Sequence, residues 1–116
     1  MVQITMQVPE ELANKIQPIQ YWLPAILELS LVGFKTLATE TATEMIQLFA
    51  ANPSPQQVLD YHVSERAQDR LRRLLALNAA GLLGEEEQQE LDELHKIEHT
   101  IIKLKAQLAK QVQRGA

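Results

Sequence analysis

The sequence predicts a mainly α-helical fold that begins with one short β-strand and ends in an antiparallel helical hairpin. Three observations lead to this prediction: apolar and polar residues alternate near the N-terminus, apolar residues recur at three- and four-residue steps over residues 55–112, and a proline-rich break separates these regions. The break predicts two parts, a dimerisation unit at residues 1–52 and the hairpin at residues 53–116.

Composition restricts the class of protein. With 116 residues, of which 46% are hydrophobic, the chain can bury one modest core. A net charge of -4 argues against binding polyanions through bulk electrostatics, and the absence of cysteine excludes disulfides and thiolate metal sites. No basic leader precedes an apolar stretch, and no run approaches the ~18 apolar residues of a membrane span. We therefore expect a soluble, cytoplasmic protein that needs no cofactor and does not enter a membrane.

The N-terminal residues have the period-two pattern of a half-buried strand. The apolar set, expected to form a dimer core, is Val2, Ile4, Met6 and Val8. The polar set on the opposite face is Gln3, Thr5 and Gln7. Pro9 ends the strand, and no later segment offers a partner for its backbone groups. We therefore predict an intermolecular ribbon with the same strand of a second copy, and hence a homodimer or a higher homo-oligomer.

Two helices are expected next. Residues 10–16 form a short helix, because Pro9 suits its first turn and two glutamates favour its positive end, and Pro18 stops it. Residues 25–34 are so rich in aliphatic side chains that this helix is expected to be buried on most sides. Residues 35–51 are also helical in spacing, but the pattern leaves open whether they extend the preceding helix or begin a new one near Thr41.

The hairpin is predicted from two apolar-periodic segments on either side of residues 78–84. Gly81 suits the left-handed position just past a helix end, and the glutamates at 85–87 suit the start of the next helix. The second arm carries a coiled-coil-like seam at Leu94, Ile97, Ile101, Leu104 and Leu108. Four arginines at residues 66–73 would meet seven carboxylates at residues 85–98, so we expect pairing across the hairpin; a nucleic-acid patch is the alternative.

The segment from Val2 to Leu12 resembles the start of ribbon-helix-helix proteins, which are dimeric repressors and antitoxins whose paired strands enter the DNA major groove. This resemblance covers about the first third of the chain. It implies that Gln3, Thr5 and Gln7 read bases, for which glutamine is chemically suited. Two lysines against five glutamates give residues 1–52 a net charge of -3, so a ribbon that only dimerises is the alternative.

A second resemblance covers Arg70 to Leu94. Its pattern, in which Leu-Asn-Ala-Ala-Gly-Leu-Leu-Gly is followed by an acidic helix start, is similar to helical hairpins in small bacterial proteins of antitoxin-like type. The resemblance implies that the hairpin binds another protein, often a toxin, while the N-terminal dimer contacts DNA.

One motif suggests metal chemistry. Residues 95–99, His-Lys-Ile-Glu-His, match the H-x-x-E-H pattern of inverzincin proteases, in which His95 and His99 would share a zinc ion and Glu98 would act as the base. Such an enzyme needs a further ligand and a substrate cleft, for which this chain has little room. We therefore predict no metal site and no enzymatic activity, and we interpret both histidines as solvent-exposed.

Together these patterns predict a non-enzymatic, homodimeric antitoxin-like or transcriptional regulatory protein that binds a partner protein through its helices and DNA through its ribbon. The alternative is an interaction or assembly factor with no DNA role. Tyr21 and Trp22 can serve either as an anchor for the partner or as a cap on the core. The residues predicted to bind the partner are Tyr21, Trp22, Leu94, Ile97, Ile101, Leu104 and Leu108.

Overall fold

The computed structural model describes residues 2–115, with side chains described through residue 112, and over this range it contains six α-helices and one 3-10 helix. The elements are α1 (Glu10–Ile16), η1 (Gln17–Ile19), α2 (Leu23–Leu31), α3 (Ala38–Ala50), α4 (Pro55–Leu59), α5 (Glu65–Ala79) and α6 (Glu85–Gly115). The predicted mainly α-helical class is confirmed. None of the helices in this range combines the length and the apolar character that crossing a membrane requires.

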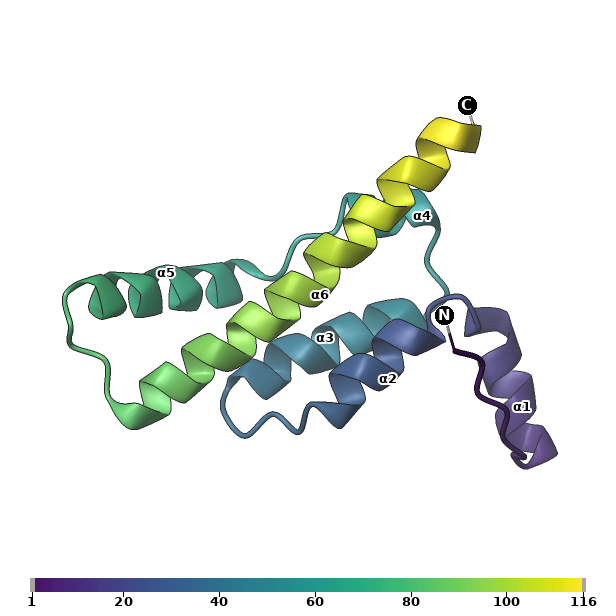
Figure 1. Ribbon diagram of the computed structural model, residues 1–116, viewed down its shortest axis with the longest axis horizontal. Helices are drawn as coiled ribbons and strands as arrows, with labels where there is room; N and C mark the ends of the chain where they lie inside the picture. Colours follow the sequence, from purple (N-terminus) through teal and green to yellow (C-terminus); the bar gives the residue numbers. More distant parts are fainter. Residues whose placement is uncertain (1, 116) are drawn as a thin grey trace.

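The long helix α6 organises the molecule. It runs diagonally across the view in Figure 1, with α2 and α3 along one flank, α5 along the other, and α4 crossing it in this view near its C-terminal half. Helices α3, α4 and α5 each pack on it, whereas α2 packs on α3. A single helix of 31 residues cannot stand alone in water, so its apolar stripe is covered by these shorter helices from both sides.

One hydrophobic core joins the two predicted parts. The Trp22 ring stacks on the Phe49 ring with centroids 5.6 Å apart, which closes the end of the core formed by α2 and α3. The buried apolar residues are Trp22, Leu29, Ala38, Ala42, Met45, Phe49, Val58, Leu74, Leu91, Leu94, Ile97 and Leu108. They come from both sides of residue 52, so the two parts share their packing; their division into separate units stays a prediction.

The N-terminal strand is not formed by the single chain. Residues 2–9 have no regular secondary structure, and no β-strand occurs anywhere in residues 2–115. The physical reason is that a strand exists only through backbone hydrogen bonds to a neighbour, and no such neighbour lies within the described chain. The intermolecular ribbon therefore requires a second copy and remains a proposal.

Helix α2 differs from the prediction that it is buried on most sides. Leu29 is buried, but Leu27 is 43% exposed and Leu31 is 82% exposed. The prediction was wrong because α2 packs one stripe on α3 and presents the rest outward, despite its high aliphatic content. The helix ends before Gly33, whose φ of 69° is the left-handed conformation typical of a glycine beyond a helix end.

A buried carboxylate fixes the connection from α2 to α3. Glu93 on α6 is only 5% exposed, and its Oε1 atom accepts hydrogen bonds from the Lys35 amide at 3.0 Å, the Thr36 amide at 3.2 Å and the Thr36 hydroxyl at 2.9 Å. These donors compensate for the desolvation of the carboxylate. Helix α3 then begins at Ala38, which settles the open question of where the third helix starts.

The first arm of the predicted hairpin is two helices rather than one. Pro55–Leu59 forms α4, residues 60–64 form a loop, and α5 begins at Glu65. The Ser54 hydroxyl caps α4 by accepting from the Gln57 amide at 3.2 Å, and the Ser64 hydroxyl caps α5 by accepting from the Ala67 amide at 3.2 Å. The cap at Ser64 starts a new helix at a point where the apolar spacing alone suggested continuity.

The reversal between the arms matches the prediction. Gly81 has a φ of 71°, and the Leu82 amide donates to the Leu77 carbonyl at 2.9 Å, which satisfies a carbonyl at the end of α5. Across the arms, Arg70 forms a bidentate ion pair with the buried Glu90, with Nε–Oε2 at 2.6 Å and Nη2–Oε1 at 3.2 Å. This hydrogen bonding raises the pKa of Arg70 and confirms charge pairing at one point of the hairpin.

Candidate interaction surface

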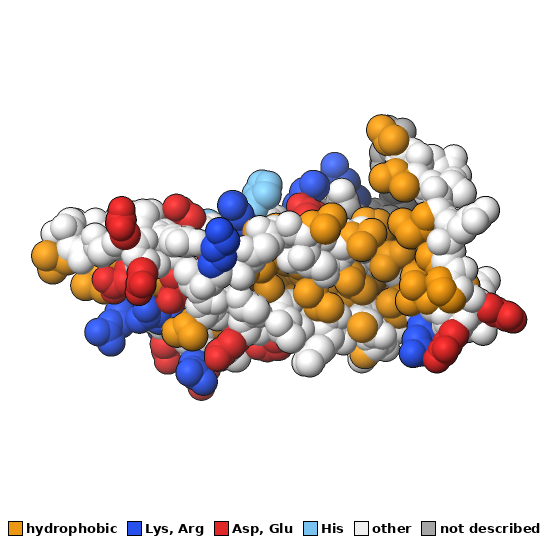
Figure 2. All heavy atoms as spheres, turned by 90° about the horizontal axis from the view of Figure 1, so that it is seen from below, with side chains coloured by type: hydrophobic (Ala, Val, Ile, Leu, Met, Phe, Trp, Pro, Cys, Tyr) orange, Lys and Arg blue, Asp and Glu red, His pale blue; other side chains and the backbone are white. Residues whose placement is uncertain are grey.

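Exposed apolar side chains gather on the N-terminal part of the molecule. Figure 2 shows hydrophobic side chains concentrated over the centre and right of that face, whereas charged side chains crowd its left end. Nine of the thirteen large exposed hydrophobic residues precede residue 38: Val2, Ile4, Met6, Leu12, Tyr21, Leu27, Leu31, Val32 and Leu37. We call these residues, other than Tyr21, the N-terminal apolar surface. Exposed apolar side chains that gather into a patch are typical of an interaction site.

The segment at residues 2–8 is exposed through residue 7, and Val8 at its end is half-buried. Val2 is 91% exposed, Ile4 is 81% exposed and Met6 is 65% exposed. No backbone hydrogen bond joins residues 2–8 to any other described residue. An apolar segment with free backbone donors and acceptors can pair with an extended strand of another chain.

Helix α2 contributes the second portion of this surface. Leu27 and Leu31 are four residues apart and therefore lie on the same face of the helix, away from the buried Leu29. The sequence does not mark them as surface residues, because the aliphatic composition of a helix does not indicate which of its sides is covered. The Leu12 and Val32 side chains extend the exposed set on α1 and just beyond α2.

The aromatic pair at residues 21 and 22 divides between core and surface. Trp22 is buried against Phe49, so it caps the core and is not available to a partner. Tyr21 is half-exposed, meets the Trp22 ring edge-on at 4.7 Å, and donates through its hydroxyl to Gln111 Oε1 at 2.9 Å. This bond ties the start of α2 to the C-terminal part of α6.

The apolar seam of α6 packs into the core of the chain itself. Leu94, Ile97 and Leu108 are buried in the core, and Ile101 and Leu104 are half-buried against it. A partner protein can contact the buried three only if the helices first move apart, so partner binding at the seam stays a prediction. The exposed apolar residues on α6 are instead Ile102 and Val112, which fall outside the seam pattern.

The residues predicted to read DNA are accessible. Gln3, Thr5 and Gln7 are all exposed. The nearest cation in the sequence, Lys15, lies on α1, where it pairs with Glu11 at 3.9 Å on the surface. The glutamines are thus free to hydrogen-bond, but no described lysine or arginine on this segment would anchor a phosphate.

The histidine pair lies exposed on α6. His95 and His99 are one helical turn apart, and within the described residues no group of three or more histidine and acidic side chains is arranged to hold a metal ion. Of the arginines on α5, Arg70 pairs with Glu90 and Arg72 pairs with Asp69 at 2.9 Å. Comparison of the chain with protein-family models, with curated proteins and with solved structures found no match.

Proposed function

We propose that this chain is a non-enzymatic homodimer of antitoxin-like or regulatory type, in which residues 2–8 of two copies pair as a ribbon and the helices bind a partner protein. The observation that carries the proposal is the segment at residues 2–8, whose backbone has no hydrogen bonds within the described chain and whose apolar residues Val2, Ile4 and Met6 are exposed. A second copy supplies the missing hydrogen bonds because each strand is the template for the other.

The available area suits such a dimer. Burying a large aliphatic side chain contributes about 1.5–3 kcal/mol at about 25 cal/mol per Å², which corresponds to roughly 60–120 Å² each. Weighted by exposure, the eight residues of the N-terminal apolar surface therefore offer on the order of 300–600 Å² per chain. A standard interface buries about 800 Å² per partner, of which somewhat more than half is apolar. The segment at residues 2–8 alone is too small, so α2 is expected to take part.

The dimer is tested with Ile4→Lys. A charge on the apolar side of the ribbon would be buried without a partner, so this variant is expected to be monomeric at concentrations where the unmodified chain is dimeric. Analytical ultracentrifugation measures the mass directly. Gln3→Lys is the matched control, because it adds the same charge to the same segment on the polar side and should remain dimeric.

The ribbon model fails if the unmodified chain is monomeric at about 100 μM, a concentration at which even a weak dimer is populated. It also fails if Ile4→Lys and Gln3→Lys have the same mass. Circular dichroism of both variants distinguishes a lost interface from lost folding, since α1 to α6 do not depend on Ile4 within the chain.

A protein partner is the second component of the proposal. Ile102 and Val112 on α6 are apolar side chains that the described part of the chain leaves exposed. Purification of the tagged chain from its native host, followed by mass spectrometry, identifies what it binds. Loss of the co-purified protein with Ile102→Glu, but not with the neighbouring Lys103→Glu, would place its site on α6.

DNA contact is the second candidate function, favoured by the exposure of all three polar residues of the segment. A gel shift on the chain's own upstream region is expected to show weak binding that Gln3→Ala with Gln7→Ala removes, because the glutamine side chains supply the base contacts. Absence of a shift at low salt, where electrostatic binding is strongest, would exclude DNA contact and leave the interaction or assembly factor.

A further inference from the structure

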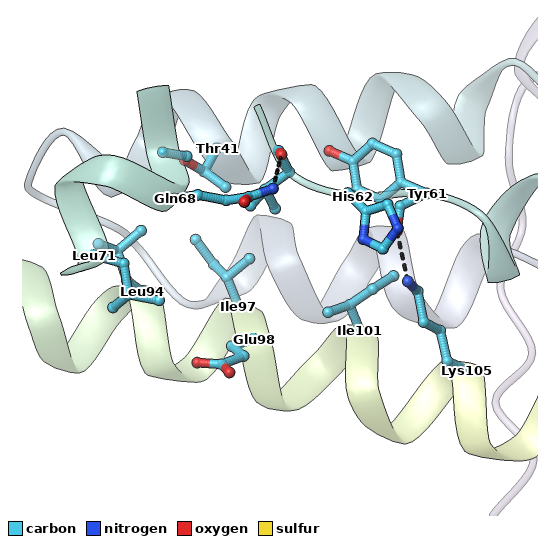
Figure 3. A pocket seen from close by; sticks show the side chains of 12 residues that line it. Thr41, Tyr61, His62, Gln68, Leu71, Leu94, Ile97, Glu98, Ile101 and Lys105 are labelled. Atoms are coloured by element: carbon cyan, nitrogen blue, oxygen red, sulfur yellow. Dashed lines mark hydrogen bonds between the residues drawn. The ribbon is translucent and has the colours of Figure 1, made fainter. Parts of the chain in front are cut away.

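A pocket of about 290 Å³, which includes no residue of the dimer segment, lies between α3, the loop at residues 60–64, α5 and α6. Figure 3 shows the side chains that line this pocket. Its apolar walls are Val63, Ala67, Leu71, Leu94, Ile97 and Ile101. The pocket thus lies where the loop between α4 and α5 meets α3, α5 and α6.

Side-chain hydrogen bonds fix the loop that forms one wall of the pocket. Gln68 Nε2 donates to the Val63 carbonyl at 2.8 Å, and the Tyr61 hydroxyl donates to Glu44 Oε1 at 3.1 Å. Burial, and then the nearby Glu44 carboxylate, raises the pKa of Tyr61 well above its usual value, so the phenol stays protonated and keeps donating. These bonds hold the pocket open without help from a ligand.

One end of the pocket carries a half-buried cation that has no counter-ion. Within the described residues, Lys105 Nζ donates to the Tyr61 carbonyl and takes part in no ion pair. Figure 3 shows His62 beside this ammonium, whereas Glu98 lies toward the opposite end, near Ile97. A partly desolvated ammonium whose only partner is a neutral carbonyl favours an anion at its free positions.

We propose that this pocket binds a small amphipathic monocarboxylate, with its apolar chain against Ile97 and Ile101 and its carboxylate at Lys105 Nζ. His62 can donate a second hydrogen bond in either charge state of its ring. Glu98 at the far end disfavours a ligand with a second negative charge. At about 30 Å³ for each water-sized group, the pocket holds about ten non-hydrogen atoms, which is the size of octanoate.

The binding test uses three probes of equal chain length: sodium octanoate, octan-1-ol and octylammonium chloride. Calorimetric titration of the full chain is expected to show one octanoate per chain, bound at least about tenfold more tightly than the alcohol, because a charge-assisted hydrogen bond forms only with the acid. Octylammonium is expected to bind least. Proton NMR contacts between the octanoate chain and the Ile97 and Ile101 methyl groups locate it.

Lys105→Met tests the charge while keeping the length of the side chain. It is expected to weaken octanoate binding about tenfold and to leave octanol binding unchanged. Lys105→Arg, which retains the cation, should bind octanoate nearly as well as the unmodified chain. Lys103→Met is the matched control, because it removes the same charge two residues away on an exposed position outside this pocket.

Three results would overturn the proposal: no saturable octanoate binding, equal affinity for octanoate and octanol, or unchanged octanoate affinity in Lys105→Met. The result is independent of the proposed dimer, since Ile4 lies outside the pocket. Ile4→Lys is therefore expected to bind octanoate with unchanged affinity, so failure of the dimer and failure of the pocket can be told apart.

Discussion

At the scale of single residues, three carboxylates of α6 with similar neighbours in the sequence have different roles. Glu90 pairs with Arg70 across the hairpin, Glu93 holds the α2–α3 connection, and Asp92 between them is exposed and accepts only from Gln88 Nε2 at 3.0 Å. The helical period places positions 90 and 93 on the buried face and 92 on the opposite one. Charge composition alone could not separate these roles.

Glu93→Ala is expected to destabilise the fold by about 2–4 kcal/mol, because each buried donor left without an acceptor costs about 1–3 kcal/mol and water can reach some of them. Urea unfolding measures the loss, and hydrogen exchange should quicken at the Thr36 amide. Glu93→Gln keeps an acceptor oxygen and should cost less. Asp92→Ala is the control, expected to change stability by no more than about 0.5 kcal/mol. A loss below about 1 kcal/mol in Glu93→Ala would contradict the anchoring role.

At the scale of elements, turn and cap residues were good predictors, and apolar spacing was a weaker one. Gly81 located a chain reversal and the proline-rich break located an interruption between helices, because φ above zero and a missing amide hydrogen are local constraints. The spacing from Leu59 to Leu71 ran through the loop at residues 60–64 without a visible interruption. Ser64 was the available signal there, since a serine followed by a glutamate is a common helix start.

The exposed surfaces, like the helices, could be predicted only where a local sequence pattern defines them. The alternation at residues 2–8 indicated an apolar set, of which the structure leaves Val2, Ile4 and Met6 exposed and Val8 half-buried. The exposed side of α2 and the pocket at Lys105 could not be predicted, because both depend on which neighbours cover a helix. Leu31 and Leu29 are chemically identical and two residues apart, yet one is exposed and the other is buried by α3.

At the scale of the whole molecule, one core spans the chain while the N-terminal apolar surface lies outside it. Folding of the single chain and association of two chains are therefore separate steps that are linked by mass action. If two copies bury this surface, dissociation accompanies unfolding, and the melting temperature must rise with protein concentration.

The expected rise is about 3 °C for each tenfold increase in concentration, given an unfolding entropy of about 2.1 cal/mol/K per residue in each chain. Calorimetry between about 1 and 100 μM covers the range in which typical weak dimers dissociate. Ile4→Lys should melt at one temperature throughout, close to that of the most dilute unmodified chain, because it retains the core and lacks the interface. Gln3→Lys should keep the concentration dependence. A constant melting temperature for the unmodified chain would show that the N-terminal apolar surface does not couple two copies to folding.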